Sequence, residues 1–283
     1  MKLKDLQIAS VVRDSKSPLL FLVAAQNHPG YGGGTTLYAQ KIVELGCLDG
    51  AEPEKEHIGV MIQDHFYGCN DYGLSNVHQW LNSDQSDWFS PSHDKDTPPA
   101  DPYTRYNEVP YDTRPGFLSQ FSDTFKQALI QVDVPYLKKT GKDVGIMTSV
   151  PGKVFLPSRT EIGRGDEHGY QEGTLFPLAY DMSVYRTTMT EELLAKYGRE
   201  INPERSTAHY DAPQIYDPKY GWWYWLRTAN MGYSFLNRVA SPYGALSYTY
   251  SNNDSVGIRP VLNLDGELEV VSNGKFNKIF TIL

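Results

Sequence analysis

Two short segments combine acidic residues with a histidine, and these residue types could hold a metal ion. They are SHDKD, with His93, Asp94 and Asp96, and GDEHGYQEG, with Asp166, Glu167, His168 and Glu172. Neither segment has a recognised metal-ligand spacing, so solvated loop charges are the favoured interpretation of both. We therefore predict no cofactor, with a structural calcium ion at the second segment as the alternative.

Residues that could act as nucleophiles are few. The two cysteines, Cys47 and Cys69, are too few for a disulfide framework and lack the close pairing of a zinc or redox motif. Neither lies in a basic or helix-terminal setting that would favour a thiolate. Ser158, in LPSRTE, lacks the flanking glycines of a hydrolase nucleophile. The sequence thus predicts two inert thiols and no catalytic residue.

The stretch from Trp222 to Pro260 has the composition of a binding surface. It holds nine aromatic residues and only four charged ones, together with many Ser and Asn. Tyr and Trp give rigid contact area at low entropic cost, and Ser, Gly and Asn give adaptable hydrogen bonding. We therefore predict a ligand-binding loop region at 226–256. Its candidate contacts are Asn230, Tyr233, Ser234, Phe235, Asn237, Tyr243, Ser247, Tyr248, Tyr250, Asn252 and Asn253.

Composition limits the partners of the chain. It has 283 residues, of which 40% are hydrophobic, and a formal net charge of -8. Nucleic acid binding needs a concentrated field of Lys and Arg that this sequence lacks, so a protein or cell-surface ligand is the predicted partner. The apolar runs are too short for a membrane span, and MKLKDLQIAS lacks the apolar segment of a signal peptide. We expect no membrane insertion and synthesis in the cytoplasm without a signal peptide.

The elements that must position these residues begin with alternating apolar residues near the N-terminus. Leu6–Arg13, Leu19–Ala25 and Thr36–Val43 are predicted strands, and the glycine-rich segment Gly30–Gly34 separates the last two. HPGYGGGTT lacks the GK[ST] ending of a phosphate-binding loop, so these glycines indicate a hairpin turn. We expect a three-stranded antiparallel sheet in this part of the chain.

Two helices and a long loop are predicted in the middle of the chain. The first helix covers NVHQWLN and follows Ser75, a good capping residue. The second covers FLSQFSDTFKQALI, and a buried stripe recurs along it every four residues. That stripe consists of Phe117, Phe121, Phe125 and Leu129. The Pro-rich segment 84–116 between the two helices is predicted to be a long loop.

The remaining elements complete an α+β pattern. KVFLPSRTEIG is predicted to be a strand that runs into a turn, and a third helix is predicted over Thr188–Gly198, with Thr188 and Glu191 at capping-box spacing. Strand alternation along WWYWL cannot place all four aromatic residues on one face. GIRPVLNL is a predicted strand, and Asp265-Gly266 and Asn273-Gly274 are hairpin signals, with ELEVV and KIFTIL expected to pair. We predict a single domain spanning 1–283.

The order of five segments resembles an uncharacterised lectin-like domain family of Firmicutes, gut bacteria and phages. The segments are SNVHQWLN, PGFLSQFSDTFKQAL, KVFLPSRTEIG, YWLRTA and GIRPVLNL. The pairing of WLR at 225–227 with GIRP at 257–260 is the most specific part of the resemblance. It implies a C-type lectin fold of the formylglycine-generating-enzyme-like branch, with mixed antiparallel sheets, two or three short helices and much irregular loop. Arg227 and Arg259 would then hold loops through backbone carbonyls or a carboxylate.

The resemblance also implies a function. The branch contains the variable proteins of diversity-generating retroelements, whose C-terminal cassettes favour Asn, Tyr, Ser and Asp, as the candidate contacts do. Formylglycine-generating enzymes use a cysteine pair near the C-terminus, whereas no cysteine follows Cys69 here. We therefore expect a non-catalytic ligand-binding protein, with such a variable protein as one form of it. The alternatives are a phage structural or receptor-binding component, on a phage particle or displayed at a surface, and an enzyme of this fold with unknown substrate.

Overall fold

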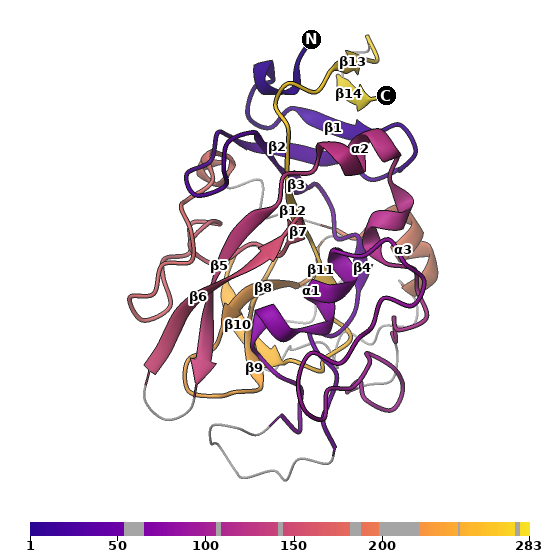
Figure 1. Ribbon diagram of the computed structural model, residues 1–283. Coiled ribbons are helices and arrows are strands. Elements are labelled where there is room, and N and C mark those ends of the chain that lie inside the picture. Colours follow the sequence, from indigo (N-terminus) through magenta and orange to yellow (C-terminus); the bar gives the residue numbers. More distant parts are fainter. Residues whose placement is uncertain are drawn as a thin grey trace.

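The computed structural model describes residues 1–53, 65–105, 109–140, 144–181, 188–197, 221–242, 244–274 and 278–283 (Figure 1). Strands dominate these residues and short helices lie between them, so the chain has an α+β fold. The buried hydrophobic side chains form one cluster that extends from Leu3 to Ile282. None of the helices in the described ranges is long and apolar enough to cross a membrane.

A seven-stranded sheet joins the two ends of the chain. Its order is β13 (Val270–Ser272), β14 (Ile279–Ile282), β1 (Val11–Asp14), β2 (Phe21–Gln26), β3 (Thr35–Ala39), β12 (Val261–Leu264) and β7 (Val154–Phe155). β1 pairs in parallel with β14, so both termini lie at the same end of the molecule (Figure 1). β1, β2 and β3 form the predicted antiparallel sheet, and β13 and β14 form the predicted C-terminal ribbon.

A five-stranded sheet carries the aromatic stretch. Its order is β10 (Leu246–Tyr250), β9 (Leu236–Ala240), β8 (Tyr224–Ala229), β11 (Gly257–Ile258) and β4 (Glu44–Leu45). A separate ribbon pairs β5 (Val132–Thr140) with β6 (Val144–Gly152). The segment GIRPVLNL was predicted to be one strand, but it forms two strands. β11 belongs to the five-stranded sheet and β12 to the seven-stranded sheet. The break falls at Pro260, because proline has no N–H to donate to a ladder.

The helices are short, and one of the two predicted caps is confirmed. η1 (Leu3–Asp5), η2 (Tyr72–Leu74) and η4 (Pro177–Tyr180) are single 3-10 turns. α1 (Asn76–Leu81) begins as predicted, because Ser75 Oγ accepts a hydrogen bond from His78 N at 3.4 Å. α3 (Glu191–Tyr197) is capped by Thr190, whose Oγ1 accepts from Leu193 N at 3.3 Å, so the predicted capping box at Thr188 is wrong. Gly198 lies outside the described residues.

The predicted phenylalanine-rich helix is interrupted. A 3-10 helix, η3 (Phe117–Gln120), is followed by α2 (Asp123–Ala128). Ser122 separates them, and its Oγ accepts a hydrogen bond from Phe125 N at 3.2 Å as the cap of α2. A serine is more favourable as a helix cap than in a helix interior, which explains the break. The aromatic stripe is nevertheless buried, as predicted.

The Pro-rich segment 84–116 packs into the core. Its described part contains no helix or strand, as predicted. Trp88 and Tyr111 are both buried, and their rings stack with centroids 5.6 Å apart and planes 7° apart. Trp80 Nε1 of α1 donates to Pro115 O at 3.0 Å, which attaches the end of the segment to the first helix. The segment is thus an ordered part of the fold.

The tryptophan-rich segment at the start of β8 is also core. Trp222, Trp223, Tyr224 and Trp225 are all buried, because side chains cover both faces of the sheet here. Trp222 Nε1 donates to Ser255 O at 2.7 Å, and Trp225 Nε1 donates to Gly46 O at 2.8 Å. Strand alternation therefore places these four side chains on two faces of the sheet, and the side chains on both faces are buried.

Of the two predicted hairpins near the C-terminus, only one forms. Asn273-Gly274 follows β13 and lies in the connection to its partner β14. β12 and β13, which flank Asp265-Gly266, are not neighbours in the sheet. The turn instead packs against η1, where Lys4 N donates to Gly266 O at 2.9 Å. A turn motif specifies a change of direction, and the tertiary contacts decide which strands pair.

Arg227 joins all three sheets from a fully buried position. Its guanidinium donates to the backbone oxygens of Pro135 in β5 at 2.7 Å, of Leu156 after β7 at 2.8 Å and of Glu172 at 2.7 Å. It also donates to both carboxylate oxygens of Glu161, each at 2.7 Å. All five N–H groups of this β8 residue therefore have an acceptor, which offsets the cost of burying the charge. The predicted framework role of Arg227 is confirmed.

Arg259 has the same kind of role between the two large sheets. It is 1% exposed, and its Nε donates to Ala39 O of β3 at 2.8 Å. Its guanidinium carbon lies 3.9 Å from the ring centroid of Tyr38 and 5.3 Å from that of Tyr224. These contacts hold the crossing from β11 to β12 against β3 and β8, and they confirm Arg259 as a framework residue.

Glu172 adds a second buried carboxyl group to the network around Arg227. Its Oε1 accepts from Leu137 N at 2.7 Å, and Thr228 Oγ1 donates to its Oε2. Burial raises the pKa of Glu172 to about 7, and the positive charge of Arg227 offsets only part of that effect. The folded protein therefore holds a proton on Glu172 under conditions in which the unfolded chain has lost it.

Replacing Arg227 by Met should lower the free energy of unfolding by about 3–5 kcal/mol, because it leaves the Glu161 carboxylate buried without its cation. Urea unfolding followed by tryptophan fluorescence measures this loss. Arg13→Met is the control, since Arg13 is exposed and should change stability by less than about 1 kcal/mol. A loss for Arg227→Met as small as for Arg13→Met would contradict the assigned role.

The free energy of unfolding should fall as pH rises from about 4.5 to about 7, because the raised pKa of Glu172 favours the protonated folded state in this window. The fall attributable to this group is about 3 kcal/mol at most, at about 1.4 kcal/mol per pH unit. Glu172→Gln keeps the shape and should flatten this part of the profile. The exposed Glu192→Gln should leave it unchanged. Parallel profiles for wild type and Glu172→Gln would refute the assignment.

Candidate functional site

Six of the predicted ligand contacts are buried. Asn230, Ser234, Phe235, Asn237, Asn252 and Asn253 each expose 5% or less of their surface. Some of their side-chain amides form hydrogen bonds with the backbone of nearby residues. Asn237 Nδ2 donates to Leu226 O at 3.2 Å, and Asn253 Oδ1 accepts from Ser255 N at 3.0 Å. Composition cannot distinguish a polar side chain that holds a loop from one that meets a ligand. The prediction that these six contact a ligand is therefore corrected by their burial.

Four predicted contacts reach the surface. Tyr233, Ser247 and Tyr250 are half-buried, and Tyr248 is 46% exposed. Tyr248 and Tyr250 lie two residues apart in β10, so their side chains are on the same face of this edge strand. Tyr243, the remaining predicted contact, lies outside the described residues. The candidate contacts in the C-terminal stretch thus reduce to three tyrosines and a serine.

An aromatic cluster gathers around Tyr250. Phe235 stacks against it with ring centroids 5.8 Å apart and planes 10° apart. Tyr67 lies 4.5 Å from Tyr250 and 5.6 Å from Phe235, and Tyr233 lies 5.7 Å from Phe235, all between ring centroids. Phe66, which is 37% exposed, lies 4.9 Å from Tyr67. We call the exposed and half-buried members, together with Tyr248 on the same face of β10 as Tyr250, the aromatic face: Phe66, Tyr67, Tyr233, Tyr248 and Tyr250.

Backbone hydrogen bonds hold the three segments of this face together. Asn252 N donates to Tyr67 O at 2.9 Å, and Asn70 N donates to Ser234 O at 2.8 Å. Asn70 Nδ2 donates to Tyr233 O at 2.5 Å and to Leu236 O at 3.0 Å. Phe66 and Tyr67 were not among the predicted contacts, because they lie far from the C-terminal aromatic stretch in the chain and only the fold brings them beside it.

Two arginines border the aromatic face. The guanidinium carbon of Arg105 lies 4.1 Å from the ring centroid of Tyr250, and that of Arg238 lies 5.8 Å from the ring centroid of Tyr248. Arg238 is held by Glu167, with Nε 2.9 Å from Oε2 and Nη2 2.5 Å from Oε1. Burial acts to raise the pKa of Glu167, but Arg238 and Arg159 outweigh burial and lower that pKa. The face therefore combines aromatic rings with cations at its edge.

The second acidic segment does not gather its side chains around a common point. Glu167 pairs with Arg159 and Arg238, and Glu172 belongs to the network of Arg227. Asp166 Oδ1 accepts from Gly169 N at 2.8 Å, and the His168 side chain is 66% exposed. In the described ranges, these residues form no group of three potential metal donors. The carboxylates near this segment are held by protein donors, which disfavours the alternative of a calcium ion here.

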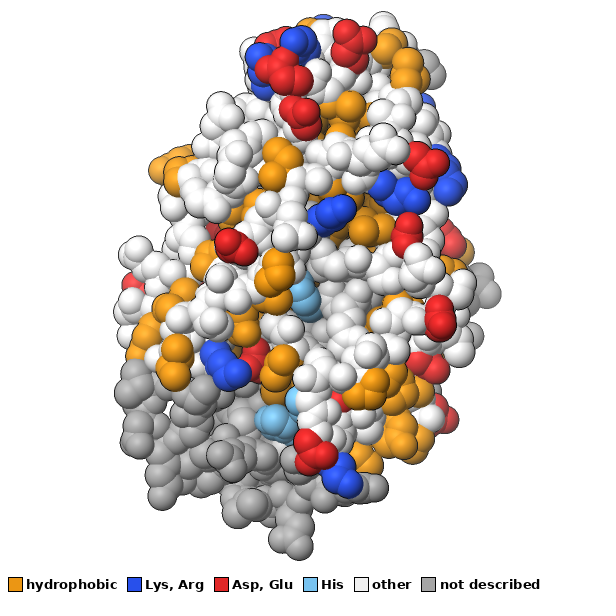
Figure 2. All heavy atoms as spheres, viewed as in Figure 1, with side chains coloured by type: hydrophobic (Ala, Val, Ile, Leu, Met, Phe, Trp, Pro, Cys, Tyr) orange, Lys and Arg blue, Asp and Glu red, His pale blue; other side chains and the backbone are white. Residues whose placement is uncertain are grey.

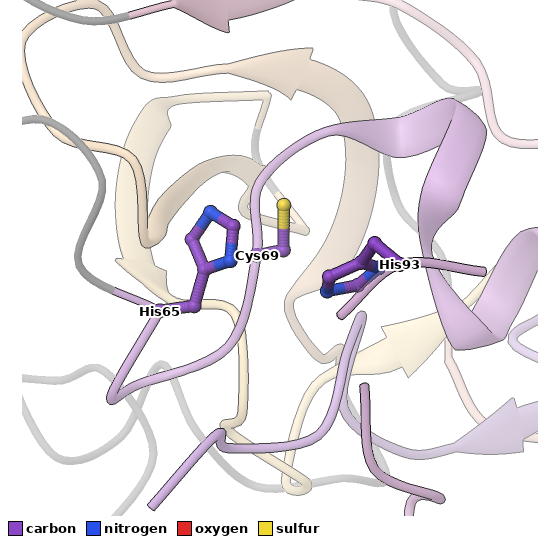
Figure 3. A group of neighbouring side chains, drawn as sticks. All are labelled: His65, Cys69 and His93. Atoms are coloured by element: carbon purple, nitrogen blue, oxygen red, sulfur yellow. The ribbon is translucent and has the colours of Figure 1, made fainter. Parts of the chain in front are cut away.

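A cluster of histidine and cysteine adjoins the aromatic face. His65 and Cys69 precede and follow Tyr67 by two residues, and their side chains lie beside that of His93 (Figure 3). One potential ligand atom of each of the three lies within 4.8 Å of those of the other two. Glu52 Oε1 lies 2.6 Å from His65 Nδ1 and 2.8 Å from His93 Nε2. The buried Glu52 carboxylate therefore faces both imidazoles.

Electrostatics in this cluster oppose a free thiolate. Burial raises the pKa of Cys69 well above its usual value, and the Asp49 carboxylate adds to the effect. Burial also acts to raise the pKa of Glu52, but His65 and His93 outweigh it and lower that pKa. The Glu52 carboxylate in turn raises the pKa of His93. Cys47 and Cys69 are both buried and reduced, which fits the predicted inert thiols.

The cluster is accessible from outside. The His65 and His93 side chains are 22% and 14% exposed, whereas Cys69 is buried behind them. On the face of the molecule in Figure 2, histidine side chains reach the surface among scattered hydrophobic and charged groups. The two imidazole rings are therefore partly exposed, whereas the thiol is not.

The segment SHDKD, for which solvated loop charges were predicted, contributes one residue to this cluster. His93 belongs to it, Asp94 is exposed, and Asp96 joins a neighbouring group with Asp49 and His93. His65 and Cys69 were not predicted to form a donor pair, although their spacing of four residues in HFYGC is a local signal for one. His93 lies too far along the chain for any spacing rule to connect it with them, so only the fold brings the three residues together.

Comparison with known proteins identifies one family. The model of the family described as "Domain of unknown function (DUF6273)" matches residues 33–266, which include the five-stranded sheet, β3, β12 and β7 of the seven-stranded sheet and all the residues of the two clusters. No curated protein and no solved structure matches the chain.

Tyr248→Ala should change the free energy of unfolding by less than about 0.5 kcal/mol, because nearly half of the ring surface is exposed. Tyr250→Ala should cost about 1–2 kcal/mol, since its ring packs between Tyr67, Phe235 and Arg105. Thermal or urea unfolding of both variants tests this order. Equal losses, or a larger loss for Tyr248→Ala, would place the rings differently.

Proposed function

The chain belongs to the family described as a domain of unknown function (DUF6273), and we propose that it is a non-catalytic binding protein. Its aromatic face contacts a protein or cell-surface ligand. The observation that carries this proposal is that five partly exposed aromatic side chains, from three segments of the chain and including Tyr250 itself, lie on one face.

The energetics of binding favour such a face. Tyrosine offers a large apolar area together with a hydroxyl group, and tyrosine is among the residues that carry most of the binding energy in protein interfaces. The buried ring of Phe235 and the backbone bonds of Asn70 and Asn252 hold the face in place before a ligand arrives. Less conformational entropy is then lost on binding.

A protein ligand is further supported by the position of β10. It is the edge strand of the five-stranded sheet, and no strand from the described parts of the chain pairs with its outer side. An extended peptide could add to such an edge through backbone hydrogen bonds, while Tyr248 and Tyr250 contact its side chains.

The fold that we propose is the C-type lectin fold of the formylglycine-generating-enzyme-like branch. It is supported by the pairing of β1 with β14 and by the irregular connections between β8 and β12, which carry the aromatic face.

Diversification by a retroelement would require exposed variable positions. Among the described candidates, burial restricts these to Tyr233, Ser247, Tyr248 and Tyr250, so variation across the whole 226–256 region is disfavoured.

The proposal is tested by selecting ligands for the purified chain from a displayed library of random peptides and from an array of bacterial surface glycans. Ligands that bind the aromatic face should lose at least about 10-fold in affinity with Tyr248→Ala or Phe66→Ala, which corresponds to about 1.4 kcal/mol. Biolayer interferometry with purified variants gives the affinities.

Tyr180→Ala is the matched control, because Tyr180 is 79% exposed and lies in η4, which packs on β2 away from β10. Selected ligands should bind this variant as they bind the wild type. The proposal fails if neither library gives a ligand, or if every selected ligand binds the Tyr248→Ala and Phe66→Ala variants with undiminished affinity.

A further inference from the structure

We propose that His65, Cys69, His93 and Glu52 bind one divalent transition-metal ion of the zinc class. The donors would be two imidazole nitrogens, a thiolate and a carboxylate oxygen. They come from three separate parts of the chain, near 52, at 65–69 and at 93, which the fold brings to one place (Figure 3).

The chemistry of the donors selects the class of metal. Imidazole and thiolate ligands suit zinc and its neighbours, whereas magnesium and calcium take oxygen ligands. One thiolate and one carboxylate would balance the two positive charges of the ion, so the occupied site would be electrically neutral. A neutral centre is favourable here, because Cys69 and Glu52 are almost completely buried and an isolated charge in such surroundings is costly.

The spacing of the donors is compatible with a tetrahedral site. In such a site, nitrogen, oxygen and sulfur ligands at their usual distances from zinc lie about 3.3–3.7 Å from one another. The donor atoms of His65, Cys69 and His93 now lie within 4.8 Å of one another, and Glu52 Oε1 lies 2.6 Å and 2.8 Å from the two imidazoles. These distances would change by up to about 1.5 Å to become tetrahedral, and rotation of the two side chains of each pair can share that change.

The Nδ1 atom of His65 provides an independent sign that a ligand could bind here. This atom is shielded from solvent and, within the described residues, has no hydrogen bond of acceptable geometry. The 2.6 Å approach of Glu52 Oε1 to this atom is a close contact without the alignment of a hydrogen bond. A buried imidazole nitrogen without a hydrogen bond is costly, and coordination of a metal ion by this nitrogen would remove that cost.

The neighbouring carboxylates support the site from outside. Asp49 Oδ2 accepts from Cys69 N at 2.9 Å, and its Oδ1 accepts from Asn76 N at 3.0 Å, so Asp49 attaches Cys69 to the start of α1. Asp96 Oδ2 accepts from Ser92 N at 2.7 Å. Asp49, His93 and Asp96 form the competing donor group, but these backbone bonds already occupy its carboxylates. The group with the cysteine is therefore the better site.

The chain around Cys69 has features common to metal-binding loops. Asp71 N lies 3.3 Å from Cys69 Sγ and donates to it, which favours the thiolate that a metal requires. Gly68 N donates to His65 O at 2.8 Å and closes the turn between the two ligands. Gly68 has φ +85°, and a Cβ atom there would lie 2.6 Å from Asp49 O, so this turn requires glycine.

The metal site would control the aromatic face through Tyr67. This residue lies midway between His65 and Cys69, and its ring contacts those of Tyr250 and Phe235. An ion bound to both neighbours would hold Tyr67 in place by closing the loop at two points. The metal site stands independently of the ligand, while its control of the aromatic face rests on the proposed function.

The site is tested with the full chain, stripped of metal by a chelator, dialysed and titrated with Co²⁺ and then with Zn²⁺. We expect one Co²⁺ per chain, with the intense visible bands of a tetrahedral centre and a near-ultraviolet charge-transfer band from the thiolate. Zn²⁺ should displace Co²⁺ and raise the melting temperature. Cys69→Ser should remove the charge-transfer band, and His65→Gln should weaken Zn²⁺ binding by more than about 100-fold, beyond the loss typical of outer-shell changes.

Cys47→Ser is the matched control, because Cys47 is the other buried cysteine and is not in the donor group. It should keep the charge-transfer band and the Zn²⁺ affinity. Circular dichroism of each metal-free variant shows whether it is folded, and His93→Gln replaces any variant that is not. The metal site is refuted if wild type gives no charge-transfer band, or if Cys47→Ser removes the band while folded Cys69→Ser keeps it.

A separate measurement tests the link to Tyr67. Peptides selected on the aromatic face should bind the Zn²⁺-loaded chain at least about 10-fold more tightly than the metal-free chain. Equal affinities, with Zn²⁺ binding confirmed, would refute the control of the face but leave the metal site intact. Failure to select any peptide would count against the proposed function and would not affect the cobalt result.

Discussion

The buried ion pair between Arg227 and Glu161 is the constraint on which the rest of the fold depends. A guanidinium that is fully removed from water must find acceptors for five N–H groups, and these acceptors come from β5, from the chain after β7 and from the segment that contains Glu161 and Glu172. Each sheet must therefore take one position relative to β8. Arg259 applies the same constraint at the crossing from β11 to β12.

The aromatic face depends on that framework. β8 is fixed by Arg227, β9 pairs with β8, and β10 pairs with β9, so the positions of Tyr248 and Tyr250 follow from the buried network. Two residues of the face come from the loop at 65–69, which is joined to the β8–β9 connection through Asn70. A polar core thus supports a surface of tyrosine rings, and the proposed ligand site and proposed metal site meet in one short loop.

Much of the fold was predictable from local patterns. The three N-terminal strands, the cap at Ser75, the buried stripe from Phe117 to Leu129 and the C-terminal ribbon all follow from alternation, spacing and capping residues. The predictions that failed involve choices between similar local options. Ser122 starts a new helix within a periodic pattern, Thr190 caps α3 in place of Thr188, and the Asp265-Gly266 turn packs on η1 without forming a hairpin.

The sequence by itself determined the α+β class and the aromatic character of the C-terminal stretch, because composition and short-range periodicity carry that information. The framework roles of Arg227 and Arg259 followed from the resemblance of their segments to a known family. Only the tertiary structure decided that six polar or aromatic residues of that stretch are buried, that Phe66 and Tyr67 complete the aromatic face, and that His65 and Cys69 meet His93. Burial and clustering depend on contacts between residues far apart in the chain, and a single sequence does not specify those contacts through any local pattern.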